Sequence, residues 1–318
     1  MSTGIEELVS SAIGGDRRSL GRLLSYLEGD PAKASQILSS VLGRAGKAHV
    51  IGVTGIPGSG KSTLISRLIA AYRRKGHRVA VIAIDPTSPY SHGALLGDRL
   101  RMQEHATDPG VFIRSVSTRG LKGGLSLAAL GMIEVFDAAG YDKIFVESVG
   151  VGQAEVDIMH TAHTLLVVTM PGVGDEIQAL KAGVMEIGDI YVLNKCDKPE
   201  ASKTYEYLSF AIRTGELRSR GGWTPKIIRT AATLGQGIND LVTSIDEHYR
   251  YIVEGGLYTD KVSVRRRFIL KILAEKIFLD ALNEAYAKGE IPAIAESTDM
   301  YREAIEIIRK IVGRVCSA

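Results

Sequence analysis

The chain has 318 residues, of which 45% are hydrophobic and 24% are charged. This length and composition allow one large α/β domain with a sizeable core and helical additions. The formal net charge of +3 is too small to indicate nucleic-acid binding. The two cysteines, Cys196 and Cys316, exclude a disulfide framework or a cysteine-rich zinc site.

The chain shows no targeting or membrane signal. The N-terminal sequence MSTGIEELVSS has no basic start and no apolar stretch of signal-peptide length. The longest apolar runs, such as TLLVVTM, are far too short to span a bilayer. We therefore expect a soluble, cytoplasmic protein that uses neither a membrane nor a nucleic acid as its partner.

Residues 1–47 are expected to form an N-terminal helical extension. The segment RRSLGRLLSYLEGD places four leucines on one helical face. Asp30 is expected to cap a second helix, because Pro31 then occupies the first helical position, where a missing N–H costs nothing.

Residues 48–254 carry the pattern of an α/β domain. Seven short segments are continuously apolar and rich in Val and Ile, as strands buried on both faces must be. They read HVIGVT, RVAVIAID, VFIRSV, KIFVES, TLLVVTM, DIYVLN and KIIRTA. Helical stretches separate most of them, which predicts a mostly parallel, doubly wound sheet flanked by helices. Ligands bind such sheets at the carboxyl ends of the strands, so the chemistry is expected there.

Residues 255–318 are expected to form a helical arm. TDKVSVRRRFILKILAEKIFLDALNEAYAKG reads as one long helix with a cap at residues 259–260, and a shorter helix with a cap at residues 297–299 follows it. Both helices could pack on the core of the same chain. Because the first is long for a globular protein, an arm that pairs with a second subunit is the other interpretation.

The segment GIPGSGKST matches the full P-loop pattern and lies between a predicted strand and a predicted helix. Its glycines let backbone N–H groups turn inward around phosphate oxygens, and the helix N-terminus adds a favourable dipole. Lys61 is expected to reach the β- and γ-phosphates, and Ser62 to ligate Mg²⁺. The candidate nucleotide-binding residues here are Gly55, Ile56, Pro57, Gly58, Ser59, Gly60, Lys61, Ser62 and Thr63.

The segment DIYVLNKCDKP places Asn194, Lys195 and Asp197 at the end of a late strand, in an N-K-x-D arrangement. The carboxylate of Asp197 can accept hydrogen bonds from N1–H and the 2-amino group of guanine. Adenine offers neither donor there, so such a site rejects ATP through unpaired buried polar groups. Lys195 can lie along the base plane, and Asn194 can tie the P-loop to the base loop.

A second candidate base segment, TAATLGQGI, follows the last predicted strand. Ala231 and Ala232 occupy the place where guanine-binding proteins use backbone N–H groups to contact the guanine oxygen, and Thr233 follows them. An ordinary strand-to-helix loop is the alternative interpretation.

Three acids lie near the ends of predicted strands or in predicted loops: Asp85, Asp98 and Glu147. A Mg²⁺ ion bound to two phosphates still needs oxygen ligands, either directly or through water. Together with Ser62, these acids are the candidate metal ligands. The alternatives are a helix cap or a surface acid for Asp85 and Glu147, and a plain helix start for Asp98.

Several of these motifs occur together in one order and resemble the MeaB/ArgK family of P-loop GTPases. They are the P-loop, VAVIAIDPTSPYSHGALLGDRLRM, VESVGVGQAEVDI and PGVGDEIQALKAGVMEIGDIYVLNKCD. The resemblance covers roughly residues 10–318, and the motifs are specific to the family. It implies the class of P-loop proteins shared with signal-recognition particle and nickel-insertion GTPases, with a switch strand that ends in Glu rather than Asp.

The resemblance also implies roles for individual residues. It places Lys61, Ser62, Asp85, Asp98 and Glu147 around phosphate and Mg²⁺, and the N-K-x-D residues around guanine. It implies a third switch, GDEIQALKAG, in which Lys181 responds to the nucleotide state and to a partner. Two departures stand out: Ser148 stands where relatives commonly have Thr, and Ala231-Ala232 stands where they commonly have Ser-Ala.

The function implied is hydrolysis of GTP to GDP and phosphate by a G-protein chaperone. Its partner would be a cobalamin-dependent acyl-CoA mutase of the methylmalonyl-CoA mutase type, whose cofactor loading or protection it would gate, and it would work as a homodimer. One alternative is a nickel-insertion metallochaperone, but such a protein needs a Cys/His metal site that the sequence lacks. Another is a kinase or ATPase of the LAO/AO transport type, which N-K-x-D disfavours.

Overall fold

The structure is a computed structural model that describes most of the chain. It covers residues 3–85, 102–117, 127–148, 158, 161–172, 188–215, 217, 222–291 and 299–317. The chain divides into two compact units, Met1–Arg265 and Arg266–Ala318. Among the described helices, none combines the length and the apolar character needed to cross a membrane.

The seven predicted strands all form. They are β1 (His49–Gly55), β2 (Val79–Asp85), β3 (Val111–Ser117), β4 (Lys143–Glu147), β5 (Thr164–Thr169), β6 (Ile190–Leu193) and β7 (Lys226–Arg229). The helices of the described residues are α1 (Thr3–Ile13), α2 (Arg17–Gly29), α3 (Pro31–Val41), α4 (Lys61–Arg74), α6 (Leu127–Ala138), α9 (Ala201–Arg213), α10 (Ile238–Glu254), α11 (Leu257–Ala287) and α12 (Met300–Ser317). Two short 3-10 helices, η1 (Gln103–His105) and η2 (Ala232–Leu234), complete the set.

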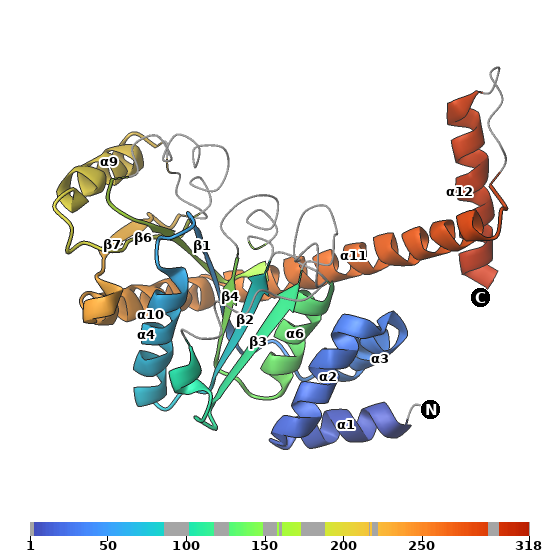
Figure 1. The fold of residues 1–318 in the computed structure, drawn as a ribbon, viewed down its shortest axis with the longest axis horizontal. Coiled ribbons are helices and arrows are strands. Elements are labelled where there is room, and N and C mark those ends of the chain that lie inside the picture. The colour runs from blue at the N-terminus through green and yellow to red at the C-terminus, as the bar shows by residue number, and fades with distance from the viewer. Residues whose placement is uncertain are drawn as a thin grey trace. The chain divides into compact units, whose positions relative to one another are not determined.

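The strands form one sheet in the order β3-β2-β4-β1-β5-β6-β7, and every neighbouring pair is parallel. This is the doubly wound α/β fold of P-loop nucleoside triphosphate hydrolases, as the sequence predicts (Figure 1). Strand β1 lies at the centre, between β4 and β5. The chain leaves β1 toward β2 on one side, while β5 lies on the other, so the end of β1 is the switch point where such sheets bind ligands.

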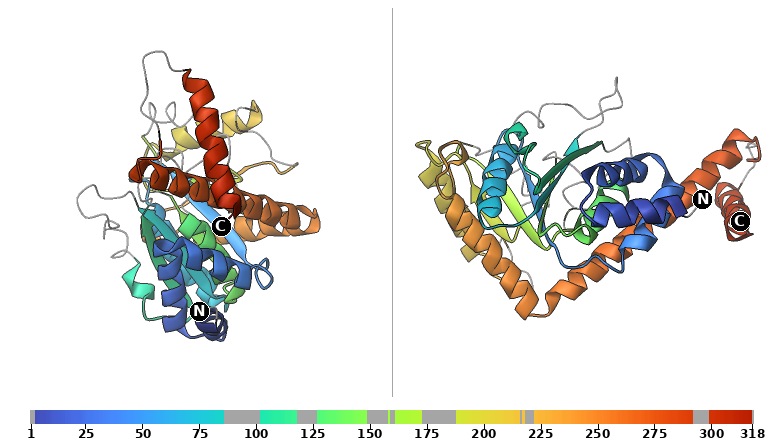
Figure 2. Two further views of the ribbon diagram at one scale, coloured as in Figure 1. Left: turned by 90° about the vertical axis from the view of Figure 1, so that its right-hand side faces the viewer. Right: turned by 90° about the horizontal axis from the view of Figure 1, so that it is seen from below.

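Helices cover both faces of the sheet. On one face, α4 and α10 bury Leu64, Leu68 and Leu241 against Ile51 and Val168. On the other, α9 packs against alternate strand residues, such as Tyr191 and Leu193, because successive side chains of a strand point to opposite faces. Helix α6 lies across the sheet from α4 (Figure 2). The inner strands β2, β4, β1, β5 and β6 are thereby buried on both faces, which explains their continuous apolar sequences, whereas the edge strands β3 and β7 are only partly buried.

The N-terminal extension forms three helices, of which α2 and α3 pack on α6 and α1 packs on α2 and α3. All four leucines of α2 are buried, and Leu27 packs against α6 at Gly131, where a Cβ atom would lie 3.0 Å from the leucine side chain. The Asp30 carboxylate accepts a hydrogen bond from the Lys33 backbone N–H at 3.1 Å, so the predicted cap of α3 is confirmed. An ion pair of 2.7 Å between Arg114 and Glu28 ties α2 to β3.

Helix α11 begins at Leu257, two residues before the predicted cap, because the α10 helix ends at Glu254 and only Gly255 and Gly256 separate the two. Its first turns belong to the first unit. There Val262 is buried, and the fully buried Arg265 guanidinium donates to the Glu134 carboxylate of α6 at 2.7 Å. The boundary between the units therefore falls inside α11.

The second unit contains the rest of α11 and the helix α12. The Asp299 carboxylate accepts hydrogen bonds of 3.2 Å from the Tyr301 and Arg302 N–H groups, so Asp299 is the cap among the three predicted. Glu290, which follows α11, pairs with Lys310 and Arg314 of α12. Within this unit Ile311 is buried, whereas many neighbouring apolar side chains are exposed.

Candidate nucleotide site

The candidate site lies where β1, β4 and β6 end. Because these strands are parallel, their carboxyl ends lie at the same edge of the sheet. Strand β1 ends at Gly55 and leads into the P-loop, β4 ends at Glu147, and β6 is followed by Asn194. Lys61 of the phosphate motif and Asn194 of the base motif are 133 positions apart in the sequence. The fold nevertheless brings the two motifs together at this edge.

Two glycines of the P-loop are required by its geometry. Gly55 has a φ of +135°, and a Cβ atom there would lie 1.9 Å from the Val168 carbonyl oxygen. Gly60 has a φ of +91°, and its Cβ atom would lie 2.6 Å from the Asn194 amide nitrogen. A side chain at either position would both strain the backbone and clash, so the loop can close over this edge only with glycine.

Lys61 bends back over the loop that precedes it. Its ammonium group donates to the carbonyl oxygens of Gly55 at 2.9 Å and Ile56 at 3.2 Å, and the side chain is buried. These two acceptors hold the ammonium group over the start of the P-loop. The first turn of α4 and this ammonium group together form an electropositive end suited to phosphate.

Glu147 lies against the first turn of α4. The Ser62 hydroxyl donates to its carboxylate at 2.7 Å, and both side chains are buried. The end of β4 is fixed against β1, because the Ser148 N–H donates to Val53 O and the Ser148 hydroxyl donates to the Thr54 hydroxyl, both at 3.0 Å. A hydroxyl oxygen and a carboxylate oxygen, both of which can ligate a metal ion, thus meet beside the P-loop.

Asn194 joins three segments through its side-chain amide. Its nitrogen donates to the Ser59 carbonyl of the P-loop at 2.8 Å. Its oxygen accepts from the Thr230 hydroxyl and from the Ala232 N–H, both at 3.1 Å. The predicted tie between the P-loop and the base loop therefore exists as a hydrogen bond, and the same side chain also holds the segment after β7.

Lys195 adopts a left-handed backbone conformation, with a φ of 59°. Its ammonium group donates to the Gly58 carbonyl at 2.6 Å and lies 3.5 Å from the Met170 sulfur. The side chain is thereby stretched toward the P-loop, while Asp197 is exposed at the surface beside it. An accessible carboxylate next to an extended lysine stem suits a planar base that binds from solvent.

The loop after β7 differs from the expectation for its alanines. The Ala231 N–H donates to Gln236 O at 3.1 Å, and the Ala232 N–H donates to Asn194, so both groups have acceptors within the protein. Both alanine side chains are buried, whereas Thr233 is exposed. In this arrangement the alanines shape the loop rather than present free N–H groups to a base.

Two residues of this region were not predicted from the sequence. Thr230, directly before Ala231, donates to Asn194, and Arg67 of α4 contacts the same loop. The position of Thr230 at a strand end is a signal that could have found it. Arg67 belongs to no motif, and only the packing of α4 beside η2 brings it to the loop.

Three predicted residues cannot be placed in the site. Asp98 and Lys181 lie outside the described residues, and so does the side chain of Asp85, although its backbone ends β2. Within the described residues, no group of three His, Cys, Asp or Glu side chains is arranged to hold a metal ion.

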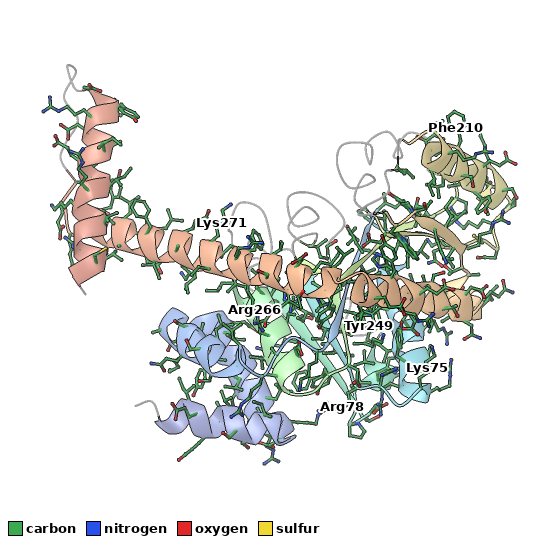
Figure 3. All side chains as sticks on the ribbon, turned by 180° about the vertical axis from the view of Figure 1, so that it is seen from behind. Lys75, Arg78, Phe210, Tyr249, Arg266 and Lys271 are labelled. Carbon is green, nitrogen blue, oxygen red and sulfur yellow. The ribbon has the colours of Figure 1, made fainter. Side chains whose placement is uncertain are left out.

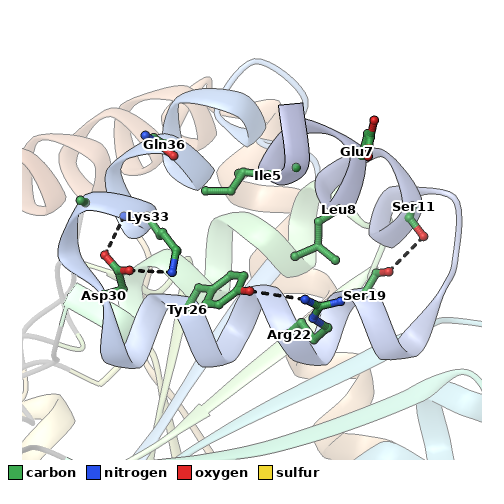
Figure 4. A pocket seen from close by; sticks show the side chains of 12 residues that line it. Ile5, Glu7, Leu8, Ser11, Ser19, Arg22, Tyr26, Asp30, Lys33 and Gln36 are labelled. Carbon is green, nitrogen blue, oxygen red and sulfur yellow. Dashed lines mark hydrogen bonds and ion pairs between the residues drawn. The ribbon is translucent and has the colours of Figure 1, made fainter. Parts of the chain in front are cut away.

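A groove of about 670 Å³ lies elsewhere, among α1, α2 and α3 (Figure 4). Its polar side chains largely satisfy one another: Lys33 pairs with Asp30 at 2.9 Å and lies 4.5 Å from the centre of the Tyr26 ring. Ser19 donates to Ser11 at 3.0 Å. The groove contains none of the predicted nucleotide-binding residues.

Comparison with known proteins agrees with this geometry. A family model described as "Methylmalonyl Co-A mutase-associated GTPase MeaB" matches residues 20–287. A Pyrococcus horikoshii protein named as a GTPase is 45% identical over 316 residues, which cover 98% of this chain and 99% of the relative. The Mus musculus protein named "Methylmalonic aciduria type A homolog, mitochondrial" is 29% identical over 307 residues, covering 91% of this chain and 74% of the relative.

A solved structure supports the fold. The crystal structure titled "LAO/AO transport system kinase" superposes with a TM-score of 0.70 and covers 98% of both chains, at 21% sequence identity. At this identity the likeness concerns the fold alone.

Proposed function

The chain belongs to the MeaB family of GTPases, and we propose that it uses GTP binding and hydrolysis to control a cobalamin-dependent acyl-CoA mutase. The observation that carries the proposal is the family match over residues 20–287, because the family is described as mutase-associated. The mouse relative's name, which refers to methylmalonic aciduria, supports a mutase of the methylmalonyl-CoA type.

For the phosphate end of the nucleotide, we propose binding by the P-loop residues 55–63. The Lys61 ammonium, now held by two carbonyl oxygens, would exchange them for β- and γ-phosphate oxygens. The glycines that allow the loop to close would let its N–H groups face the phosphates. At these two positions, phosphate oxygens would replace neutral carbonyl acceptors, so that both partners of each hydrogen bond would be charged.

For the base, we propose recognition by Asp197, with Lys195 along the ring plane. The exposed Asp197 carboxylate can accept two hydrogen bonds from guanine and none from adenine. Asn194 would act by holding the P-loop and the base loop at a fixed separation. Thr233, exposed at the tip of the second loop, would complete the pocket wall.

A magnesium ion fits the donor set at the start of α4. Ser62 and Glu147 are hard oxygen ligands 2.7 Å apart beside the P-loop, which is the chemistry that Mg²⁺ prefers. We propose that Ser62 holds the ion, with Glu147, Asp85 and Asp98 binding it directly or through water. When bound, the ion would neutralise charge on the phosphates. Glu147 would keep the Ser62 hydroxyl oriented and would place a negative charge near the attacking water.

The proposed switch depends on the segment that contains Lys181. A γ-phosphate can order loops that hydrolysis then releases, and a partner can read the difference. We propose that the mutase holds this segment so that Lys181 reaches the nucleotide, because positioned charge is what phosphoryl transfer needs. We also propose that the chain acts as a homodimer through residues 255–318.

The test is GTP turnover with and without the purified cobalamin-dependent mutase of the same organism. We expect a nucleotide-sensitive complex and faster hydrolysis in its presence. Lys181→Ala should keep most of the basal rate and lose most of the acceleration. Absence of binding would refute the mutase as partner, and equal acceleration of both proteins would refute the role of Lys181. A competition assay in the same series separates GTP from ATP, which a kinase of the transport type would use.

A further inference from the structure

Arg67 lies on α4, five residues after Ser62, outside every motif of the P-loop and N-K-x-D patterns. Its guanidinium group makes two hydrogen bonds to successive carbonyl oxygens of the loop after β7. Nε donates to Ala232 O at 3.0 Å, and an Nη atom donates to Thr233 O at 3.1 Å. The planar fork of an arginine allows both contacts at once, whereas a lysine can make them only as a point charge.

The two acceptors are carbonyl groups of the short 3-10 helix η2. The Ala232 carbonyl already accepts the Gly235 N–H at 3.2 Å, so Arg67 adds a second donor to it. Carbonyl groups at the end of a helix carry partial negative charge that a cation stabilises. The geometry therefore gives Arg67 a favourable position on this loop that does not depend on any ligand.

These contacts close a ring of hydrogen bonds. Ala232 is held on one side by Asn194, which accepts from its N–H, and on the other by Arg67, which donates to its carbonyl oxygen. Asn194 in turn donates to Ser59 of the P-loop. The P-loop leads directly into α4, the helix that carries Arg67. The hydrogen bonds thus run from the P-loop through Asn194 and the loop after β7 back to α4, the helix that follows the P-loop.

We propose that Arg67 is a positioning residue for guanine-nucleotide affinity, and that it sets the separation between the loop after β7 and the P-loop. This inference rests on the proposed base site. Arg67 acts through Ala232 and Thr233 and has no role in the chemical step. When it is lost, Asn194, the backbone hydrogen bonds of Thr230 and the two buried alanines still hold the start of the loop after β7, but the Ala232 and Thr233 carbonyl groups lose their donor from α4. The nucleotide must then order this part of the loop as it binds. The free-energy cost of ordering the loop lowers the affinity for ligands that carry a base.

The experiment compares two ligands by calorimetry on the full-length chain: GDP, which has a base, and inorganic tripolyphosphate, which has none. Arg67→Ala should weaken GDP binding about tenfold, the loss of one to two hydrogen bonds to a charged group. Binding of tripolyphosphate should change less than twofold. Arg67→Lys, which retains the charge and one donor, should recover part of the lost affinity.

Arg74→Ala is the matched control, because Arg74 is an exposed arginine near the end of the same helix. It should leave both affinities unchanged. If Arg67→Ala weakened the binding of GDP and of tripolyphosphate equally, the proposal would be overturned, since the effect would then act through α4 rather than through the loop after β7. Unchanged GDP binding would overturn it while leaving the base site standing. If the unmodified protein binds ADP as tightly as GDP, the base site and the role of Arg67 both fail.

Discussion

At the residue scale, the side-chain length of Glu147 decides what it can reach. Its carboxylate crosses from the end of β4 to the Ser62 hydroxyl at the start of α4. The backbone of the next residue is fixed to β1 by the hydrogen bond from the Ser148 N–H to Val53 O. The strand end therefore cannot move toward α4, and an aspartate in the place of Glu147 would be one methylene too short for the same contact.

Glu147→Gln tests whether the charge matters as well as the contact. The amide can still hydrogen-bond to Ser62 but cannot neutralise a cation or accept a proton. We expect single-turnover GTP hydrolysis to fall about 100-fold, the usual cost of one electrostatic contact at a phosphoryl or acyl centre. GDP affinity should change less than threefold, because the P-loop glycines and Lys61 remain.

The measurements are single-turnover hydrolysis over a range of Mg²⁺ concentrations and a GDP titration. Glu206→Gln, on the exposed side of α9, is the control and should behave as the unmodified protein. Unchanged hydrolysis in Glu147→Gln would mean that the carboxylate has a structural role only.

The candidate site was predictable from the sequence where its signal is local. The P-loop glycines and the N-K-x-D residues have fixed spacings, and a strand precedes each set, so both motifs could be placed at one edge of the sheet. The contact of Arg67 with the loop after β7 and the contact of Thr230 with Asn194 were not predictable. They depend on the placement of β7 beside β6 and of α4 beside η2, which no local pattern encodes.

At the element scale, polar residues at the starts of the central strands form a buried chain at the edge opposite the candidate site. Lys143 lies 3.2 Å from His49 Nδ1, His49 Nε2 lies 2.7 Å from the Thr164 hydroxyl, and that hydroxyl lies 2.9 Å from His248 Nδ1. The Tyr249 ring of α10, which Figure 3 labels together with Lys75, stacks on the His49 ring with 4.1 Å between the ring centres. The chain thus ties β1, β4 and β5 to α10.

The direction of these hydrogen bonds follows from their first donor. An ammonium group has no acceptor, so Lys143 must donate to His49 Nδ1. His49 then carries its proton on Nε2 and donates to Thr164, whose own hydroxyl proton points to His248 Nδ1. The remaining His248 nitrogen faces the Asp189 carboxylate at 3.6 Å. A second proton on either imidazole would remove an acceptor from this chain.

Stability should therefore fall in acid. Burial holds the pKa of His49 and of the nearby His163 well below the usual value, and burial lowers the pKa of His248 to about 4. In the unfolded chain these histidines have an ordinary pKa of about 6.5, so below that pH the unfolded chain binds more protons than the folded chain does. The stability from neutral His248 is complete above about pH 6.5 and is lost as the pH falls toward 4, with a slope of up to about 1.4 kcal/mol per pH unit. His49 and His163 act in the same direction.

Urea unfolding at several pH values between 7 and 5 measures this slope. His248→Gln should reduce the slope, because one titrating imidazole is gone, although it will also lower stability at pH 7. His77→Gln is the control, since that imidazole is 37% exposed. If His248→Gln leaves the slope unchanged, the acid sensitivity arises from other groups.

The strands illustrate what a sequence can specify about elements. Runs of Val and Ile predicted all seven, and in the five inner strands burial on both faces leaves no room for alternation. The polar residues that begin three of these segments, His49, Lys143 and Thr164, were visible too. Their alignment was not, because it depends on register: His49 pairs with Lys143, and Ile51 pairs with Thr164.

At the scale of the whole molecule, the first turns of α11 are an integral part of the first unit. Arg265 and Glu134 are both fully buried and form an ion pair with each other. Removing one partner of such a pair costs about 3–5 kcal/mol, because the other charge is left without compensation. Deleting the proposed arm from residue 255 would thus damage the GTPase unit as well, and a test of the homodimer should keep the full chain.

The second unit offers surface positions for that test. Its exposed apolar side chains include Leu270, Ile277, Tyr286, Met300, Tyr301, Ile308, Val312 and Val315. Apolar residues recur along α12 at three- and four-residue spacing, so they lie on one stripe, as in a helix that packs against another. Ile308 is 41% exposed and Val312 is 46% exposed. Charges at these two positions need not disturb the buried Ile311 between them.

Ile308→Glu combined with Val312→Glu should convert a dimer into a monomer. If a second copy covers this stripe, dimerisation would bury two carboxylates per chain without partners, a cost of several kcal/mol that exceeds what the remaining apolar contacts can offset. Light scattering after size exclusion should give twice the mass of one chain for the unmodified protein and the mass of one chain for the variant. Arg309→Glu, an exposed change of charge on the same helix, should remain dimeric. GDP affinity of the double variant should match that of the unmodified protein, which shows that the first unit is intact. A monomeric unmodified protein at all concentrations, or a double variant that keeps the dimer mass, would remove the basis for an arm that pairs two chains.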